Sequence, residues 1–390
     1  MTIATESVHG WRALPRVLPL VLVMATAMIA GVSTAWPLLA ACLLVGVSLV
    51  MALTSRAVPA VQPAAHVVAL HVLVPLQVVA TVWVRPGNLE VLVLVGVAAL
   101  TAWLTATVLV RRLAPRSVEG VLMLSTAGLA LAYLAYVAPR LGSRAQNAWV
   151  DVAVGGQWLN ANALVLVFLI GLAVAMARIF SGARSTVSVV AGVVCGAAVL
   201  LTFSRSGYLA LAAMLLVLTV VRRRAMLAVG ALAVLLITLV PSSVRDRIVF
   251  TTANGALDPS SAARLDLWEA SLGVIADMPL LGSGIHALSA AVEQQGGPGG
   301  FTFVHNTYLS LLAGFGLPIG LLVLVIAARS FLRRIRVARL GRGSTDLAAV
   351  LALAAAAVCS SFGEPMLTPV TVAPLAALLG LRHERTKGAG

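Results

Sequence analysis

Residues 186–221 read TVSVVAGVVCGAAVLLTFSRSGYLALAAMLLVLTVV, two apolar runs joined by the short polar turn Ser204-Arg205-Ser206-Gly207. Arg205 is the single charged residue of the stretch. A helix of roughly 20 apolar residues crosses a lipid bilayer, and these runs approach that length. The stretch therefore predicts two antiparallel membrane helices, over 186–203 and 207–221, with an arginine at their shared end.

The rest of the 390-residue chain has the same character. Hydrophobic residues make up 61% of it, charged residues only 10%, and the mean hydropathy is +1.03. Soluble domains contain roughly 45–50% apolar and about 25% charged residues, so this composition excludes an ordinary soluble enzyme. We predict an all-α polytopic membrane protein with about twelve transmembrane helices, over 17–35, 37–54, 64–84, 89–110, 118–138, 161–177, 186–203, 207–221, 225–240, 316–329, 346–361 and 367–381.

Basic residues are distributed unevenly over the two sides of the membrane that these helices define. With the N-terminus inside, 20 of the 27 basic residues fall on the cytoplasmic side and 7 on the outer side. Cytoplasmic loops carry such an excess of arginine and lysine. We therefore expect a multi-pass protein of the bacterial cytoplasmic (inner) membrane with both termini in the cytoplasm. The arginines follow the ends of apolar runs without an aromatic-basic patch, so no nucleic-acid partner is expected.

One long outer loop divides the chain. Residues 1–240 hold predicted helices one to nine, residues 241–303 form the outer loop, and residues 304–390 hold a re-entering segment, helices ten to twelve and a cytoplasmic tail. A structureless loop of that length is uncommon in a compact protein, so we expect it to fold outside the membrane.

The middle of this loop predicts a helix over 260–277. Pro279 and the Gly282-Ser283-Gly284 turn end it. Its expected apolar face consists of Leu265, Trp268, Leu272 and Ile275. The glycines between 296 and 300 predict a hinge.

Several kinds of catalytic site are excluded by their motifs. The single lysine, Lys387, lies near the end of the tail, so a phosphate-binding loop with Gly-Lys-Ser/Thr is absent. His383-Glu384 lacks the second histidine of a zinc-protease motif, and no Asp-x-Asp pair occurs. The three cysteines lie inside apolar runs without metal-ligand spacing. We therefore expect no metal and no cofactor.

Three polar residues on the predicted outer side are the candidate catalytic residues. Arg205 is predicted on the outer side and is therefore an exception to the cytoplasmic excess of basic residues. Its side chain either extends to the outer lipid headgroups or binds an anion at the membrane surface. Arg264 begins the loop helix and either pairs with Asp266 or faces a ligand on the same side as Trp268. His305 lies where the chain re-enters the membrane, and a lone interfacial histidine is either structural or a proton acceptor.

Weaker candidates for substrate binding surround these three. Glu364 lies at the outer end of the eleventh helix and could orient an arginine or the histidine. Asn306 and Tyr308 either cap and pack the re-entering helix or contact substrate. The loop residues Arg245 and Arg247 flank Asp246 and form either a solvated cluster or a contact to a lipid phosphate.

An ordered set of motifs resembles the O-antigen ligase/polymerase family. It comprises Ser204-Arg205-Ser206-Gly207, Arg264-x-x-x-Trp268, Pro279-Leu280-Leu281-Gly282-Ser283-Gly284, and His305-Asn306-Thr307-Tyr308-Leu309 followed by Gly314 and Gly316. The resemblance covers roughly residues 160–330. It implies about twelve helices, an outer loop containing helices, and transfer of a glycan from undecaprenyl pyrophosphate to an acceptor hydroxyl without metal or nucleotide. It also implies that Arg205 and Arg264 bind the pyrophosphate and that His305 acts near the acceptor.

The residue chemistry agrees with this implication. A sugar pyrophosphate is already activated, so the enzyme mainly has to neutralise the leaving anion, and guanidinium groups stay charged while doing so. A histidine with an ordinary pKa near ~6.5 can accept the proton of the acceptor hydroxyl. We therefore expect a metal-independent, inverting glycan transferase of the outer face, with a lipid-linked donor and a glycan or glycolipid acceptor as partners. A polysaccharide polymerase of the same family remains an alternative, and a lipid-linked glycan flippase or transporter is the alternative from another class.

Overall fold

The structure, a computed structural model, describes residues 114–138, 152–154, 157–159, 161–183, 185–225, 230, 259–301, 303–340, 343–367 and 369–381. The helices predicted between residues 17 and 110 lie outside these residues, as does most of the one predicted over 225–240.

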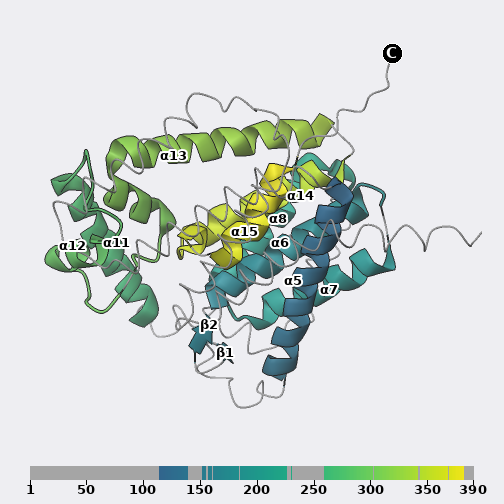
Figure 1. Ribbon diagram of the computed structural model, residues 1–390, viewed down its shortest axis with the longest axis horizontal. Helices are drawn as coiled ribbons and strands as arrows, with labels where there is room; N and C mark the ends of the chain where they lie inside the picture. The colour runs from purple at the N-terminus through teal and green to yellow at the C-terminus, as the bar shows by residue number, and fades with distance from the viewer. Residues whose placement is uncertain are drawn as a thin grey trace, which may run out of the picture.

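The described residues are helical apart from one short hairpin (Figure 1). In chain order the elements are α5 (Pro115–Val137), β1 (Val152–Val154), β2 (Gln157–Leu159), α6 (Ala161–Phe180), α7 (Thr186–Leu201), α8 (Arg205–Val221), η4 (Arg223–Ala225), α11 (Pro259–Asp277), α12 (Leu288–Gln294), α13 (Thr307–Leu340), α14 (Ser344–Ser360), η5 (Pro365–Leu367) and α15 (Pro369–Gly380). The strands β1 and β2 pair antiparallel, with Ala153 opposite Trp158.

The helical fold class is confirmed. Among the described helices, α5 and α13 are long and apolar enough to cross a membrane, and five shorter apolar helices accompany them. The total of twelve helices remains a prediction. The predicted helix over 186–203 corresponds to α7, and the one over 207–221 corresponds to α8.

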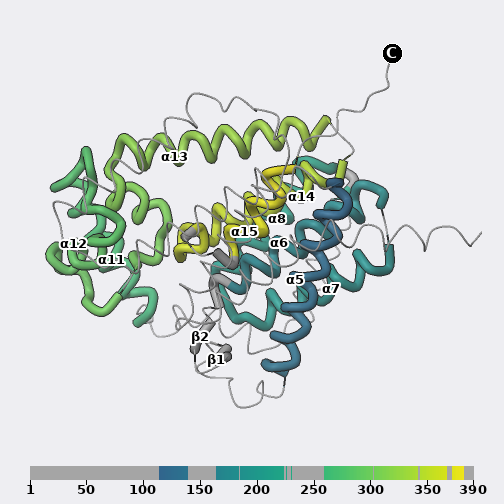
Figure 2. Tube along the Cα trace, viewed as in Figure 1, coloured from purple at the N-terminus to yellow at the C-terminus, as the bar shows by residue number. Residues whose placement is uncertain are grey.

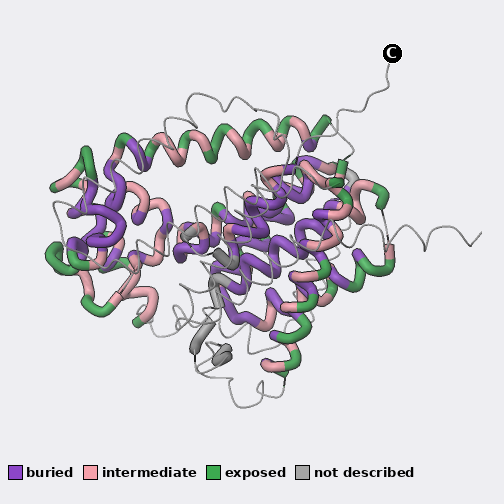
Figure 3. Tube along the Cα trace, viewed as in Figure 1, coloured by how far each residue is buried: buried purple, intermediate pink, exposed green. Residues whose placement is uncertain are grey.

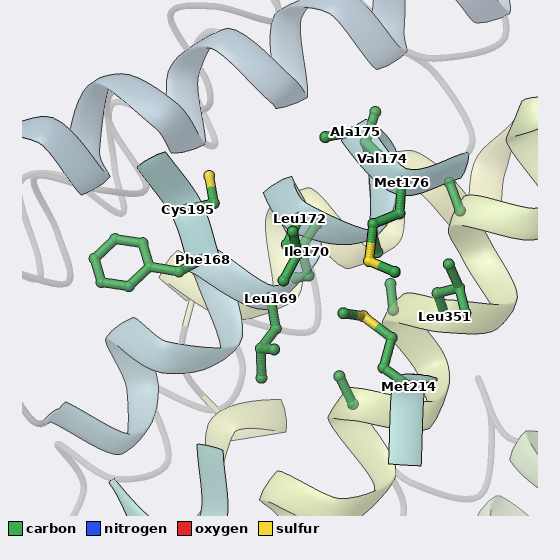
Figure 4. Packing of buried hydrophobic residues seen from close by; sticks show 14 of the residues in the cluster. Phe168, Leu169, Ile170, Leu172, Val174, Ala175, Met176, Cys195, Met214 and Leu351 are labelled. Carbon is green, nitrogen blue, oxygen red and sulfur yellow. The ribbon is translucent and has the colours of Figure 1, made fainter. Parts of the chain in front are cut away.

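The larger hydrophobic core is built around α6. Helices α5, α7, α8, α14 and α15 pack around it (Figure 2). Every described side chain from Leu164 to Ala177 is buried (Figure 3). Figure 4 shows Met176 of α6 beside Met214 of α8 and Leu351 of α14. A helix that is apolar all round must be covered on every side, which explains the central place of α6.

A smaller hydrophobic core holds the outer segment together. It contains Leu267, Val274, Ile285, Leu288, Val292 and Phe315, which belong to α11, the chain after it, α12 and the first turns of α13. The predicted helix over 260–277 is confirmed as α11.

The predicted apolar face of α11 is confirmed in part, since Trp268 and Ile275 pack against this smaller core. Leu265 and Leu272 are 47% and 57% exposed, while Leu267, Ala270, Ser271 and Val274 are buried. The small side chains at Ala270 and Ser271 allow the helix to lie close to its neighbours α12 and α13. The larger leucines point away from these helices.

The helix predicted over 316–329 is longer than expected. It begins at Thr307, bends at Gly316 and continues through the arginine-rich segment to Leu340. At the bend, Leu317 N donates to Pro279 O over 2.8 Å. Gly316 has φ 78°, and a Cβ added there would lie 2.3 Å from Leu280 O, so only glycine fits. The bend thus attaches the membrane helix to the turn that ends α11.

The start of α8 is also held closely. Ser204 caps the helix, since its Oγ accepts from Gly207 N over 3.2 Å. A Cβ on Gly207 would lie 2.4 Å from Val165 Cγ2 of α6, so glycine permits the close approach. This packing leaves Arg205 as the first residue of α8, at the end of the helix bundle.

Candidate active site

His305 lies immediately before α13 in an uncommon backbone conformation. Its φ is +58°, a value that non-glycine residues rarely adopt and that often marks functional sites. The imidazole packs edge-on against Phe301, with ring centroids 5.7 Å apart. Its Nδ1 lies 3.8 Å from Oε2 of Glu364. The ring is therefore oriented by a carboxyl group on one side and an aromatic ring on the other.

Glu364 is buried between α14 and α15. Its Oε1 accepts from the backbone amide of Asn306 over 3.0 Å and from Ser310 Oγ over 3.2 Å. Next to it, the Gly363 carbonyl accepts from the amide and the hydroxyl of Thr307. These bonds fasten the start of α13 to the turn after α14, so the His305–Glu364 arrangement does not depend on a single contact.

Asn306 and Tyr308 have structural partners. Asn306 Oδ1 caps α13 by accepting from the amides of Tyr308 and Leu309, over 3.0 and 3.2 Å. The Tyr308 hydroxyl donates to the Ala357 carbonyl of α14 over 2.7 Å. Both side chains therefore hold the re-entering helix in place.

Arg264 and Trp268 approach this turn from α11. The positive charge of Arg264 is close enough to act on both His305 and Glu364. The indole of Trp268 lies against Phe362, with ring centroids 6.3 Å apart. Trp268 Nε1 is buried and has no hydrogen-bond partner within the described ranges. The helix thus brings the Arg264 guanidinium toward the histidine and the carboxyl group, and the Trp268 indole against the neighbouring Phe362.

Arg205 reaches the same helix from the bundle. Its Nη2 donates to Ser261 Oγ of α11 over 3.4 Å. Ser261 and Arg264 are three residues apart, so they lie on the same side of the helix in successive turns. Arg205, Arg264 and His305, which are far apart in the sequence, are therefore gathered around the first turns of α11.

A comparison with known protein families finds a match within this chain. Residues 190–325 match the family model described as O-Antigen ligase. Over this segment the chain is similar to the O-antigen ligase family. The resemblance inferred from the motifs is thereby confirmed. A search of curated proteins finds no match.

The O-antigen ligase segment contains all three candidate catalytic residues, Arg205, Arg264 and His305, whereas Glu364 lies beyond it. The family assignment implies an enzyme of the bacterial inner membrane. It also implies lipid-linked glycan and acceptor substrates in general.

Burial shifts the pKa values of the two titratable groups in this candidate site. Burial, with a further contribution from the positive charge of Arg264, lowers the pKa of His305 to about 4. Burial raises the pKa of Glu364 to about 7, although the amides of Asn306 and His305, the Ser310 hydroxyl and Arg264 all oppose the rise. At neutral pH the imidazole is neutral and can accept a proton, and the neighbouring carboxyl group is close to its titration midpoint.

Two residues that contact the candidate site residues were not predicted from the sequence, and two predicted residues lie outside the described part of the chain. Ser261 and Ser310, which contact Arg205 and Glu364, carry no motif signal beyond their helical spacing. Arg245 and Arg247 are outside the described residues. Within the described ranges, no three His, Cys, Asp or Glu side chains gather in a way that could hold a metal ion.

Proposed function

We propose that this protein transfers a glycan from a polyprenyl (undecaprenyl) pyrophosphate carrier to an acceptor hydroxyl at the outer face of the cytoplasmic membrane. The reaction proceeds without metal and inverts the anomeric carbon. The observation that carries the proposal is the reach of Arg264, whose charge acts on His305 and Glu364 while the neighbouring turn of α11 contacts Arg205. This is a cation pair beside a neutral base, which the reaction requires.

The two arginines are the leaving-group site. Guanidinium groups bind phosphate oxygens bidentately and remain charged at any relevant pH. Arg205 and Arg264 together would neutralise the diphosphate as the bond from the anomeric carbon to its oxygen breaks and the electron pair leaves with that oxygen. Trp268 Nε1, buried without a described partner, is an additional donor toward substrate.

His305 is the general base. Because Nδ1 faces Glu364, Nε2 is the nitrogen that receives the proton of the acceptor hydroxyl as its oxygen attacks the anomeric carbon. A pKa near 4 makes the free imidazole a weak base. A bound diphosphate offsets the Arg264 charge and raises the pKa of His305, so the base gains strength when the donor is in place.

Glu364 positions the imidazole and stabilises the imidazolium that forms. Its other oxygen is occupied by Asn306 N and Ser310 Oγ, which leaves Oε2 for the histidine. Asn306 and Tyr308 fix the start of α13, and any direct contact of theirs to substrate is secondary to that task. Arg245 and Arg247 remain candidates for contact with the lipid phosphate.

A reconstituted transfer assay tests the proposal. Purified protein in liposomes receives a lipid-linked oligosaccharide, with EDTA present and ATP absent, and product is followed by mass spectrometry. The variant His305→Ala should lose about 10²–10⁴-fold in rate, and Arg264→Ala about 10²–10³-fold. Arg336→Ala, an exposed arginine on α13 distant from the site in sequence, is the matched control and should retain full activity.

The product also separates the remaining alternatives. Glycan joined to a different acceptor identifies a ligase, and glycan joined to the same repeat identifies a polymerase. If both site variants transfer at the wild-type rate, or if donor crosses the bilayer without forming product, the proposed transferase is wrong.

A further inference from the structure

A second candidate binding site lies at the opposite end of the bundle from His305. A cavity of about 580 Å³ lies between the end of α6 and the end of α8 with η4. Its lining consists of Phe180, Ser181, Gly182, Val221, Arg222, Arg223 and Ala225. Arg205 begins α8 and Val221 ends it, and a helix of that length spans about 25 Å. The cavity is therefore distinct from the proposed active site.

Two arginine side chains, Arg222 and Arg223, give this cavity a positive charge. Arg223 is exposed, and no carboxylate pairs with it in the described part of the chain. Arg178, one helical turn before Ser181, differs because its guanidinium is engaged by Ser188 Oγ at 3.3 Å and by Glu119 Oε2 at 3.6 Å. Arg222 and Arg223 thus both line the cavity. Within the described residues, Arg223 has no carboxylate as counter-ion.

A buried hydroxyl in the cavity wall also lacks a partner. Ser181 Oγ is shielded from solvent and forms no hydrogen bond within the described ranges. Carbonyl groups at a helix end would repel an anion, but three of them at the end of α6 are already occupied. They accept from the amides of Ser181, Gly182 and Ala183 over 3.0, 3.4 and 3.0 Å. The guanidinium groups and the Ser181 hydroxyl in the lining can all donate to an anionic ligand.

The remaining wall is apolar. Phe180, Val221 and Ala225 line the cavity beside the arginines. Inorganic phosphate has no apolar part that could contact this wall. A phospholipid carries glycerol and acyl groups next to its phosphate and can contact both the wall and the arginines. Basic pockets between membrane helices on the cytoplasmic side bind anionic lipid headgroups. The predicted orientation of the chain puts this end of α6 and α8 at that side.

We propose that this cavity binds the phosphate group of an anionic phospholipid of the cytoplasmic leaflet. Arg222 and Arg223 contact the phosphate oxygens, the Ser181 hydroxyl donates a further hydrogen bond, and Phe180 and Val221 contact the apolar part of the lipid. The site does not depend on the transfer reaction, and it would exist if the proposed function were wrong.

Native mass spectrometry of the full chain in detergent tests this site. Phosphatidylglycerol is titrated against the protein in the presence of equal phosphatidylcholine, and bound lipid is counted. Arg222→Gln/Arg223→Gln should bind phosphatidylglycerol about 30-fold more weakly, since each basic residue near a membrane surface contributes about 1 kcal/mol. Ser181→Ala should weaken binding a few-fold. The control Arg336→Gln/Arg339→Gln removes the same charge from exposed positions on α13 and should bind as the wild type does.

Three results would overturn the assignment. One is unchanged phosphatidylglycerol binding in the Arg222/Arg223 variant, and another is an equal loss in the α13 control, which would indicate general surface charge. The third is displacement of the lipid by inorganic phosphate at the same concentration, which would mark a site for the free ion. If the double variant does not fold, the single change Arg223→Gln at an exposed position gives the same comparison with a smaller loss.

Discussion

Two buried glutamates show how the same side chain serves two ends of the bundle differently. Glu119 of α5 is 1% exposed, and its carboxylate is surrounded by the Arg178 guanidinium at 3.6 Å and by the hydroxyls of Ser344 and Thr345 at 2.7–2.9 Å. Glu364 meets an imidazole at 3.8 Å instead. The Glu119 carboxylate thus has a guanidinium and three short hydrogen bonds, which fix its position. The imidazole beside Glu364 can itself exchange a proton.

The difference in partners separates a structural contact from a chemical one. Glu119 joins α5 to the end of α6 and the start of α14, which are neighbours in the larger core. Glu364 instead joins the outer turn to the residue that we propose as the base. Substitution of Glu119 should lower the free energy of unfolding, and substitution of Glu364 should lower the transfer rate.

The largest expected effect follows from removing the imidazole. His305→Asn should lower the transfer rate by about 10²–10⁴-fold. Asparagine tolerates a positive φ, so the turn before α13 and the thermal midpoint should stay close to those of the wild type. Rates from the liposome assay and melting curves in detergent measure the two quantities. Transfer above a tenth of the wild-type rate would remove His305 from the chemistry.

Removal of the Glu119 carboxylate should lower the stability of the protein and leave its transfer rate unchanged. Glu119→Ala leaves the Arg178 charge partly buried without its partner, and loss of one member of a buried pair typically costs about 3–5 kcal/mol of unfolding free energy. The transfer rate per folded molecule should remain that of the wild type. Denaturant unfolding in mild detergent measures the loss. A variant that unfolds like the wild type but transfers slowly would reverse the comparison.

Glu364→Gln sharpens the comparison, because it keeps the size and hydrogen-bonding capacity of the side chain. We expect about a tenfold lower kcat, because the carboxylate that orients the imidazole is lost. We also expect little change in KM and no loss of stability at neutral pH.

The pH dependence of unfolding gives the control for this variant. Because burial raises the pKa of Glu364 to about 7, its contribution to wild-type stability is full below pH ~4.5 and is lost as the pH rises through 7. The glutamine variant should lack that decline. A decline of equal size in both proteins would place its origin in another group.

The smallest effect is a change in proton affinity in Arg264→Gln, measured apart from the rate loss of about 10²–10³-fold expected on removal of this guanidinium. The Arg264 charge lowers the pKa values of both His305 and Glu364, so its removal should raise both. Histidine-labelled NMR in detergent measures the upward change from about 4 at His305. An unchanged or lower value would show that Arg264 does not act on the imidazole.

The helices of the described part follow from apolar runs because a chain in lipid must satisfy its backbone hydrogen bonds within each helix. The predicted start of α7 and the predicted end of α8 coincide with those observed, and the other boundary of each helix differs by two residues. The end of α11 was predictable too, since Pro279 and the turn of glycines after it cannot continue a helix.

What could not be predicted depends on contacts between distant segments. The buried face of α11 is set by the neighbours that Ala270 and Ser271 admit, whereas the pattern of large side chains favoured Leu265 and Leu272. The early start of α13 depends on the cap by Asn306 and on hydrogen bonds to the turn at Gly363. Motifs identified Arg205, Arg264 and His305 as candidates, but the pairing of His305 with Glu364 required the fold.

An experimental structure of the protein with undecaprenyl pyrophosphate bound tests the central claim most directly. The proposed mechanism predicts the diphosphate between the guanidiniums of Arg205 and Arg264, with Nε2 of His305 open toward the anomeric position. A diphosphate bound at the other end of the bundle, or one that neither guanidinium contacts, would contradict it.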